Sequence, residues 1–261
     1  MLELVKLNKT FNPGTVNEKQ ALRDFSLRVE SGEFISVIGA NGAGKSTLFN
    51  AIAGSFFPDS GSILLDGRDI TFLPAHKRAL DMGRIFQDPM LGSCPGMSIE
   101  ENLAMAAKRG GWFSHITNAD REFFREQLRK LDMGLENRLE QPVGLLSGGQ
   151  RQALTLLMAT IVPPKLLLLD EHTAALDPGT AEKVLELTET VIRENNLTCL
   201  MITHNMASAL ELGSRTLMLH QGQILMDVSG SERVGMSVND LLERFKQSSG
   251  STLDNDRMLL N

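Results

Sequence analysis

The chain has little of what would suggest a metal-rich, disulfide-bonded or nucleic-acid-binding protein. It contains no tyrosine, one tryptophan and two cysteines among 261 residues. Cys94 and Cys199 do not form a closely spaced pair, so we expect two reduced thiols of a cytoplasmic protein. The formal net charge of −6 argues against broad binding to nucleic acid, which needs a basic surface.

Long apolar runs are also missing. The most apolar run, Leu166–Leu169, is far too short to span a bilayer. The N-terminus, Met1–Lys6, does not open the long apolar region of a secretory signal. We therefore expect an ordinary globular protein, 42% hydrophobic and 22% charged, that reaches a membrane only through a partner.

The glycine-rich segment 39–47 is the most informative part of the chain. It lies between the apolar run 34–38 and the helical pattern 48–53, and it matches the G-x-x-x-x-G-K-[ST] phosphate loop. Its N–H groups and the helix dipole would bind a triphosphate, Lys45 would reach the β- and γ-phosphates, and Ser46 would ligate Mg²⁺. The other expected nucleotide contacts here are Gly39, Asn41, Gly42, Ala43, Gly44 and Thr47.

Two acids end an apolar strand further along the chain. Four leucines lead to Asp170 and Glu171, and ligands of open α/β sheets gather at the carboxyl ends of strands. We expect Asp170 to hold the hydration shell of Mg²⁺ next to Ser46. Glu171 would polarise a water for in-line attack on the γ-phosphate.

A second glycine motif, LSGGQ, occupies residues 146–150 before an apolar helical pattern. Ser147 and the backbone of Gly148 and Gly149 would form a second anion site, with Gln150 beside it. Together with the phosphate loop, this motif makes nearly the whole chain resemble the ATP-binding subunit of ATP-binding-cassette transporters. The resemblance implies an α/β fold with a phosphate-loop NTPase core and a parallel sheet. It also implies an N-terminal antiparallel β subdomain and an inserted α-helical subdomain.

The resemblance sets the expected domain boundaries. The core would comprise residues 1–89 and 162–247, the helical subdomain residues 90–161, and a C-terminal tail residues 248–261. Hydrophobic patterning agrees with this division, because strand-like alternation dominates the first part and helical spacing dominates the middle. The pattern also predicts a strand over 84–87, helices over 182–194 and 238–245, and a final hairpin around the turn 221–222.

Further residues are assigned by the resemblance, one by one. Gln87 would touch Mg²⁺ and the attacking water and report to the helical subdomain. The loop Ala175–Asp177 would link the two sites of a dimer, with Asp177 near the nucleotide. His204, at a predicted strand end, would contact the γ-phosphate and position Glu171.

Aromatic residues raise a separate question. Relatives usually stack adenine on an aromatic side chain near the N-terminus, often a tyrosine, and here Phe11 is the candidate. Phe25 is the alternative, which we expect in the core. Trp112 is expected to pack in the helical subdomain or else to touch a membrane partner.

His172 departs from the proline or alanine that many relatives have after the catalytic glutamate. One interpretation is a solvent-facing loop residue without effect. The other is a residue near the dimer-bridging loop that makes ATP hydrolysis depend on pH near neutrality.

The resemblance also implies partners. Two copies would pack head to tail, with ATP on the phosphate loop of one copy covered by the LSGGQ motif of the other. A separate permease and an extracytoplasmic solute-binding protein would complete the system at the cytoplasmic face of the membrane, without nucleic acid. The strings 171–178 and 203–206 are similar to those of a prokaryotic importer subgroup for small solutes, aromatic amino acids among them. The alternative is a soluble ATPase of an assembly machine, such as that of iron–sulfur cluster assembly, which co-purified partners would distinguish.

Overall fold

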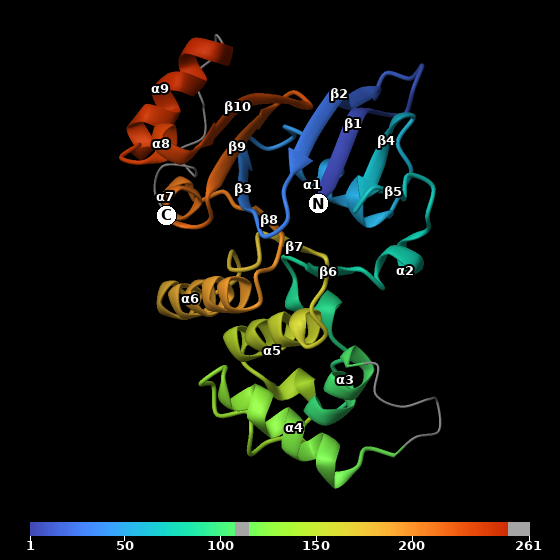
Figure 1. The fold of residues 1–261 in the computed structure, drawn as a ribbon, viewed down its shortest axis with the longest axis vertical. Coiled ribbons are helices and arrows are strands. Elements are labelled where there is room, and N and C mark those ends of the chain that lie inside the picture. Colours follow the sequence, from blue (N-terminus) through green and yellow to red (C-terminus); the bar gives the residue numbers. More distant parts are fainter. Residues whose placement is uncertain (108–114, 250–261) are drawn as a thin grey trace. The chain divides into compact units, whose positions relative to one another are not determined.

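The computed structural model describes residues 1–107 and 115–249, which form two compact units (Figure 1). The first unit contains Met1–Met82 and the described residues from Asn196 onward, and the second contains Gly83–Asn195. Trp112 and residues 250–261 lie outside the described residues. The boundaries expected for the core and the helical subdomain stay a prediction.

An antiparallel sheet opens the first unit. Its strands are β1 (Leu2–Phe11), β2 (Lys19–Val29), β4 (Ser60–Leu65) and β5 (Arg68–Asp69), in the order β2-β1-β4-β5. The alternating apolar residues of β1 and β2 point into the core, where Leu2, Leu7 and Leu22 are fully buried. The antiparallel N-terminal sheet and the hairpin of β4 and β5 are as predicted.

A second sheet of the first unit carries the phosphate loop. Its strands are β3 (Phe34–Gly39), β8 (Cys199–Ile202), β9 (Arg215–His220) and β10 (Gln223–Ser229). β3 lies between β8 and β9 and is parallel to both, whereas β10 is antiparallel to β9. Every residue of β3 is buried, as expected for a strand of a parallel sheet that is covered on both faces.

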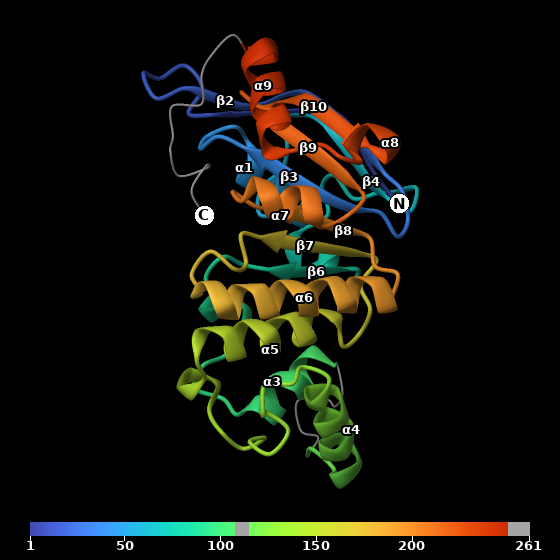
Figure 2. The ribbon, with the colours of Figure 1, turned by 90° about the vertical axis from the view of Figure 1, so that its left-hand side faces the viewer.

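Helices complete the first unit. They are α1 (Lys45–Ala53), α2 (Ala75–Arg78), α7 (Met206–Glu211), α8 (Gly230–Arg233) and α9 (Val238–Ser249). α7 and α9 cover one face of the second sheet, because Met206 and Phe245 pack against Ile38 of β3 and Met218 of β9 (Figure 2). α9 continues the predicted closing helix through Ser249, so the first two residues expected in the tail are helical.

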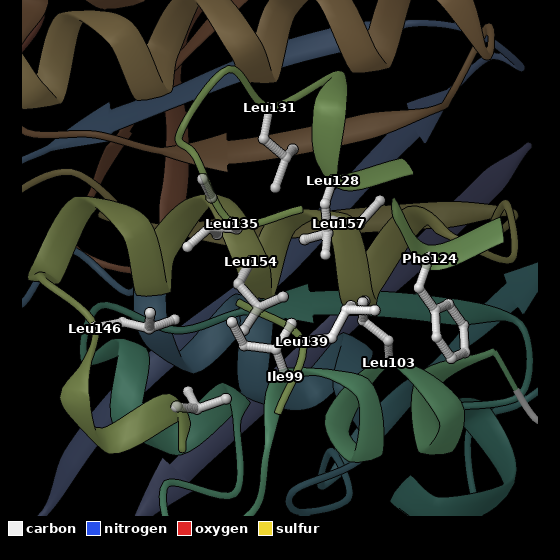
Figure 3. Packing of buried hydrophobic residues seen from close by; sticks show 12 residues of the cluster. Ile99, Leu103, Phe124, Leu128, Leu131, Leu135, Leu139, Leu146, Leu154 and Leu157 are labelled. Atoms are coloured by element: carbon white, nitrogen blue, oxygen red, sulfur yellow. The ribbon is translucent and has the colours of Figure 1, made fainter. Parts of the chain in front are cut away.

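The second unit is mostly helical. Its elements are β6 (Met82–Ile85), the 3₁₀ turns η1 (Pro89–Gly92) and η2 (Val143–Leu145), α3 (Ile99–Ala106), α4 (Asn118–Arg129), α5 (Gly148–Thr160), β7 (Leu166–Asp170) and α6 (Pro178–Glu194). β6 and β7 are neighbouring strands, and α5 and α6 run side by side (Figure 2). Ile99 and Leu103 of α3, Phe124 of α4, and Leu154 and Leu157 of α5 form its core (Figure 3).

Two element boundaries differ from the sequence prediction. α6 begins at Pro178, four residues earlier than the predicted 182, because the Asp177 carboxylate accepts a hydrogen bond from the Thr180 N–H at 3.1 Å and caps the helix. β6 spans Met82–Ile85 and not 84–87, so Gln87 lies beyond the strand and is exposed.

Candidate nucleotide-binding site

The phosphate loop joins β3 to α1 through three glycines with positive φ. Gly39, Gly42 and Gly44 have φ values of 147°, 81° and 108°. A Cβ at Gly44 would lie 2.7 Å from the carbonyl oxygen of Ala21, so a side chain is excluded there by space as well as by conformation. The loop is therefore backbone-lined, as a phosphate-binding loop requires.

Lys45 is held within this loop. Its side chain is buried, and its Nζ donates to the carbonyl oxygens of Gly39 at 2.6 Å and Ala40 at 3.2 Å. The ammonium thus lies over the glycine turn, next to the first N–H groups of α1. A positive charge and a helix N-terminus therefore meet at one place.

Within the described part of the chain, the start of α1 has no side-chain cap, a feature that it shares with the four-residue helices α2 and α8. Among the described residues, no side chain caps α1 and no acid occupies its first turn. Side chains of Ser98, Thr117, Ser147, Asp177 and Asn205 cap α3, α4, α5, α6 and α7. The first amides of α1 are thus placed to receive an anion from elsewhere.

His204 lies at the same edge of the sheet as the phosphate loop. It follows the carboxyl end of β8, whose parallel neighbour β3 leads directly into the loop. The N–H of Thr203 donates to the carbonyl oxygen of Val37 at 3.2 Å, and Asn205 caps α7 immediately after the histidine. Lys45 and His204, both predicted to contact the γ-phosphate, therefore follow the carboxyl ends of two neighbouring parallel strands of the first unit.

Asp170 and Gln87 lie in the second unit. Asp170 ends β7, is mostly buried, and forms an ion pair of 3.6 Å with Arg84 of the neighbouring β6. Burial lowers the pKa of Arg84, and the charge of Asp170 opposes that shift. Arg84 also lies over the ring of Phe86, 4.6 Å from its centroid. Arg84 and Asp170 thus pair opposite charges between the neighbouring strands β6 and β7, and Gln87 is exposed two residues beyond the end of β6.

Glu171 occupies a left-handed backbone conformation. Its φ of 45° is uncommon for a residue with a side chain and costs of order 1–3 kcal/mol. The turn that follows is closed by a hydrogen bond from the Ala174 N–H to the Glu171 carbonyl oxygen at 3.0 Å. The chain therefore reverses sharply at the residue predicted to act as the base.

Both interpretations of His172 are wrong. The side chain is 3% exposed, so it is not a solvent-facing loop residue. Burial lowers its pKa to about 4, so its charge does not change near neutral pH. Its Nε2 lies 3.1 Å from the Oγ1 of Thr188, which itself donates to the Val184 carbonyl oxygen at 2.7 Å.

The LSGGQ motif forms a capping box at the start of α5. The Ser147 Oγ accepts from the Gln150 N–H at 3.3 Å, and the Gln150 Oε1 accepts from the Ser147 N–H at 3.3 Å. Gln150 also donates to the Met133 carbonyl oxygen at 3.2 Å, and its side chain is half-buried. A Cβ on buried Gly149 would overlap the methyl group of Thr180 on α6, whereas Gly148 and Ser147 are exposed.

The positions of Asp177 and Phe11 do not by themselves test the nucleotide-binding roles predicted for these residues. Asp177 caps α6, and hydrogen bonds from Thr180 lower its pKa. Phe11 ends β1 half-exposed, with its ring edge-on to Phe56 at a centroid distance of 5.4 Å. Phe25 is 1% exposed, as predicted for a core residue. The roles predicted for Asp177 and Phe11 stay predictions.

Arg78 is a supporting residue that the motifs did not indicate. It is 1% exposed, and its guanidinium donates to the carbonyl oxygens of Ala51 and Ile52 in the last turn of α1, each at 2.7 Å. It also donates to those of Thr71 at 2.8 Å and Leu73 at 2.7 Å. A buried arginine without a nearby glutamate has no sequence pattern that would reveal it, because its acceptors are backbone oxygens.

Known proteins are similar to this chain in sequence and in fold. The family described as ABC transporter matches residues 22–174. A tyrosine transport ATP-binding protein of Clostridioides difficile is 44% identical over 253 residues, which are 94% of this chain and 99% of that protein. The thiamine import ATP-binding protein ThiQ of Salmonella paratyphi A is 36% identical over 200 residues, 77% of this chain and 81% of that protein.

A solved structure is similar over most of the chain. It is the dimeric structure of a post-hydrolysis state of an ATP-binding cassette bound to ADP and Pi. The TM-score is 0.75 at 26% identity, with 88% of this chain and 98% of that chain covered.

Proposed function

Because this chain belongs to the ABC transporter family, we propose that it is the ATP-hydrolysing subunit that energises an importer of a small solute. The observation that carries the proposal is the phosphate loop. Buried Lys45, three glycines with positive φ and the uncapped start of α1 meet there at one point. ATP binding is a property of the family, and the loop has the backbone conformation that the phosphates need.

Hydrolysis is assigned to residues of both units. Lys45 would leave the carbonyl oxygens of Gly39 and Ala40 for the β- and γ-phosphates of ATP. Glu171 would orient the attacking water, and His204 would contact the γ-phosphate from the end of β8. Phe11 is the proposed platform for adenine.

Mg²⁺ fits the donors that are present. The hydroxyl of Ser46, the carboxylate of Asp170 and the amide oxygen of Gln87 are hard oxygen donors of the kind that this ion prefers. Asp170 already lies 3.6 Å from Arg84 in an ion pair, and we propose that its carboxylate also holds the hydration shell of the metal. Bound Mg²⁺ would neutralise charge that develops on the phosphates during transfer to water.

A homodimer is proposed for the active state. The LSGGQ motif presents exposed Ser147 and Gly148 at the start of α5, where a second copy could place the γ-phosphate of its ATP. The similar cassette that was solved as a dimer with ADP and Pi supports this arrangement. ATP would then be held between the phosphate loop of one copy and the LSGGQ motif of the other, and hydrolysis would loosen the contact.

Transport requires partners that this chain would energise. None of the helices within residues 1–107 and 115–249 is both long enough and apolar enough to cross a bilayer. We propose a separate permease, an extracytoplasmic solute-binding protein and a location at the cytoplasmic face of the membrane. The similar tyrosine transport protein makes an aromatic amino acid the first solute to test. The similarity to transport and import proteins does not favour an assembly machine.

The proposal is tested by Glu171→Gln, which removes the base and keeps the shape of the side chain. We expect ATP to bind with unchanged affinity and the hydrolysis rate to fall by about 10²-fold or more, with a dimer trapped in the presence of ATP. Glu186→Gln is the matched control, since Glu186 is an exposed acid on α6. A Glu171→Gln variant that hydrolyses ATP at the normal rate would remove the role assigned to Glu171.

A further inference from the structure

Glu171 is flanked by two anchored residues. On one side, Asp170 ends β7 and pairs with Arg84 at 3.6 Å. On the other side, the ring of His172 is buried and reaches Thr188 in the third turn of α6. Between them Glu171 has a φ of 45°, a conformation that persists only where its surroundings hold it.

The hydrogen bonds around His172 have a defined direction. The Thr188 hydroxyl donates its only proton to the Val184 carbonyl oxygen at 2.7 Å. With the Thr188 hydroxyl directed at Val184, its Oγ1 accepts at 3.1 Å from the His172 tautomer that carries its proton on Nε2. The ring is thus held in one orientation by a chain of two hydrogen bonds that ends on the backbone of α6.

We propose that His172 is a positioning residue for Glu171, acting through its hydrogen bond to Thr188. This inference rests on the catalytic role proposed above for Glu171. This hydrogen bond between His172 and Thr188, called the clasp below, ties the residue after Glu171 to α6. The same helix is capped by Asp177 at the end of the loop. The loop from Glu171 to Asp177 is therefore attached to one helix at both ends, and the carboxylate of Glu171 is delivered in a single place.

Breaking the clasp should lower the rate of hydrolysis and leave ATP binding intact. His172→Phe keeps a planar ring and removes the donor, and Thr188→Val keeps the shape and removes the acceptor. In each variant we expect kcat to fall about tenfold or more while KM for ATP stays within about twofold, since small displacements of a catalytic group cost rate and not affinity. His172→Gln should retain most of the rate, because its amide can donate from nearly the same point.

Thr160→Val is the matched control for Thr188→Val. Thr160 is also buried in a helix, α5, and its hydroxyl donates to the carbonyl oxygen of Leu156, four residues earlier, at the same distance of 2.7 Å. The control therefore removes the same helix back-bond without touching the clasp. Its kcat should be close to that of the unaltered chain.

Two measurements of ATP hydrolysis by this chain decide the matter: steady-state kcat and KM for the single variants, and single-turnover rates for His172→Phe alone and in the Glu171→Gln background. If His172 acts through Glu171, His172→Phe should have no further effect on the residual rate of Glu171→Gln. An equal loss in both backgrounds, or a kcat of Thr188→Val no lower than that of Thr160→Val, would overturn the inference. Normal hydrolysis by Glu171→Gln itself would instead overturn the proposed role of Glu171. Should His172→Phe fold poorly, Thr188→Val with its control still gives the answer.

Discussion

Replacement of Arg78 by methionine tests how the helix behind the phosphate loop is held. The guanidinium is 1% exposed and donates to four backbone carbonyl oxygens, two of them, from Ala51 and Ile52, in the last turn of α1. A cation at a helix C-terminus also interacts favourably with the helix dipole. Methionine fills much of the volume and offers none of the donors, so the change isolates the hydrogen bonds from the packing.

The expected loss follows from the four contacts. Each of these bonds measures 2.7 or 2.8 Å, and hydrogen bonds to a charged donor contribute roughly 1.5–3 kcal/mol apiece. Burial of the guanidinium, which lowers the pKa of Arg78, offsets a large part of that sum. The Ala51 oxygen keeps the N–H of Gly54 at 3.2 Å, so it is not left unpaired. We expect Arg78→Met to lower the free energy of unfolding by about 3–5 kcal/mol.

Urea denaturation followed by circular dichroism measures this difference. Arg68→Met is the matched control, because Arg68 is exposed on β5 in the same unit and its loss should cost less than about 0.5 kcal/mol. Arg78→Lys should recover only part of the loss, since an ammonium cannot reach four diverging acceptors. A loss below about 1 kcal/mol for Arg78→Met would refute the reasoning, because the four carbonyl groups would then not depend on the guanidinium.

Three further predictions concern other parts of the chain. The pKa of His172 is about 4 in the folded chain, against an ordinary value of 6.5. Between these two pH values the unfolded chain binds a proton on this ring and the folded chain does not, so the free energy of unfolding falls as the pH drops through this range. From about pH 7.5 to about pH 5, the unaltered chain should lose about 2 kcal/mol more unfolding free energy than His172→Gln; an equal loss would contradict a buried neutral ring. Gly149→Ala should destabilise by roughly 1–3 kcal/mol through overlap with Thr180, and Thr180→Ser should relieve this in the double variant, whereas no relief would exclude the overlap as the cause. Cys94 is exposed, while burial raises the pKa of Cys199, so a thiol reagent should label Cys94 alone until the protein is unfolded; early labelling of Cys199 would show local opening.

Much of the fold could be predicted because its signals are local. The apolar run before Gly39, the glycines of the loop and the helical pattern from Leu48 specify a strand, a turn and a helix through neighbouring residues alone. The acids Asp170 and Glu171 follow a run of buried leucines for the same kind of reason. The predicted start of α6 at 182 is four residues too late, because the helix begins where Asp177 caps it and Pro178 occupies its first position.

The supporting contacts could not be predicted in this way. His172 and Thr188 are 16 positions apart, and nothing in that spacing reveals that the ring and the hydroxyl form a hydrogen bond. Arg78 and the end of α1 are separated by 26 and 27 positions, and the acceptors are carbonyl groups that every residue has. Burial is likewise a property of the packed chain, and it reversed the expected behaviour of His172.

The difference between what the sequence predicts and what only the folded structure shows has a physical basis. Backbone conformation and helix starts depend on residues within a turn of one another, so the order of the amino acids predicts the strand, turn and helix of the phosphate loop and the helix start at the LSGGQ motif. Solvent exclusion and the pairing of buried polar groups depend on segments that meet only after folding. Packing therefore decides that His172, expected either to face solvent without effect or to titrate near neutrality, is a buried neutral ring bonded to Thr188, and that Arg78 supports α1.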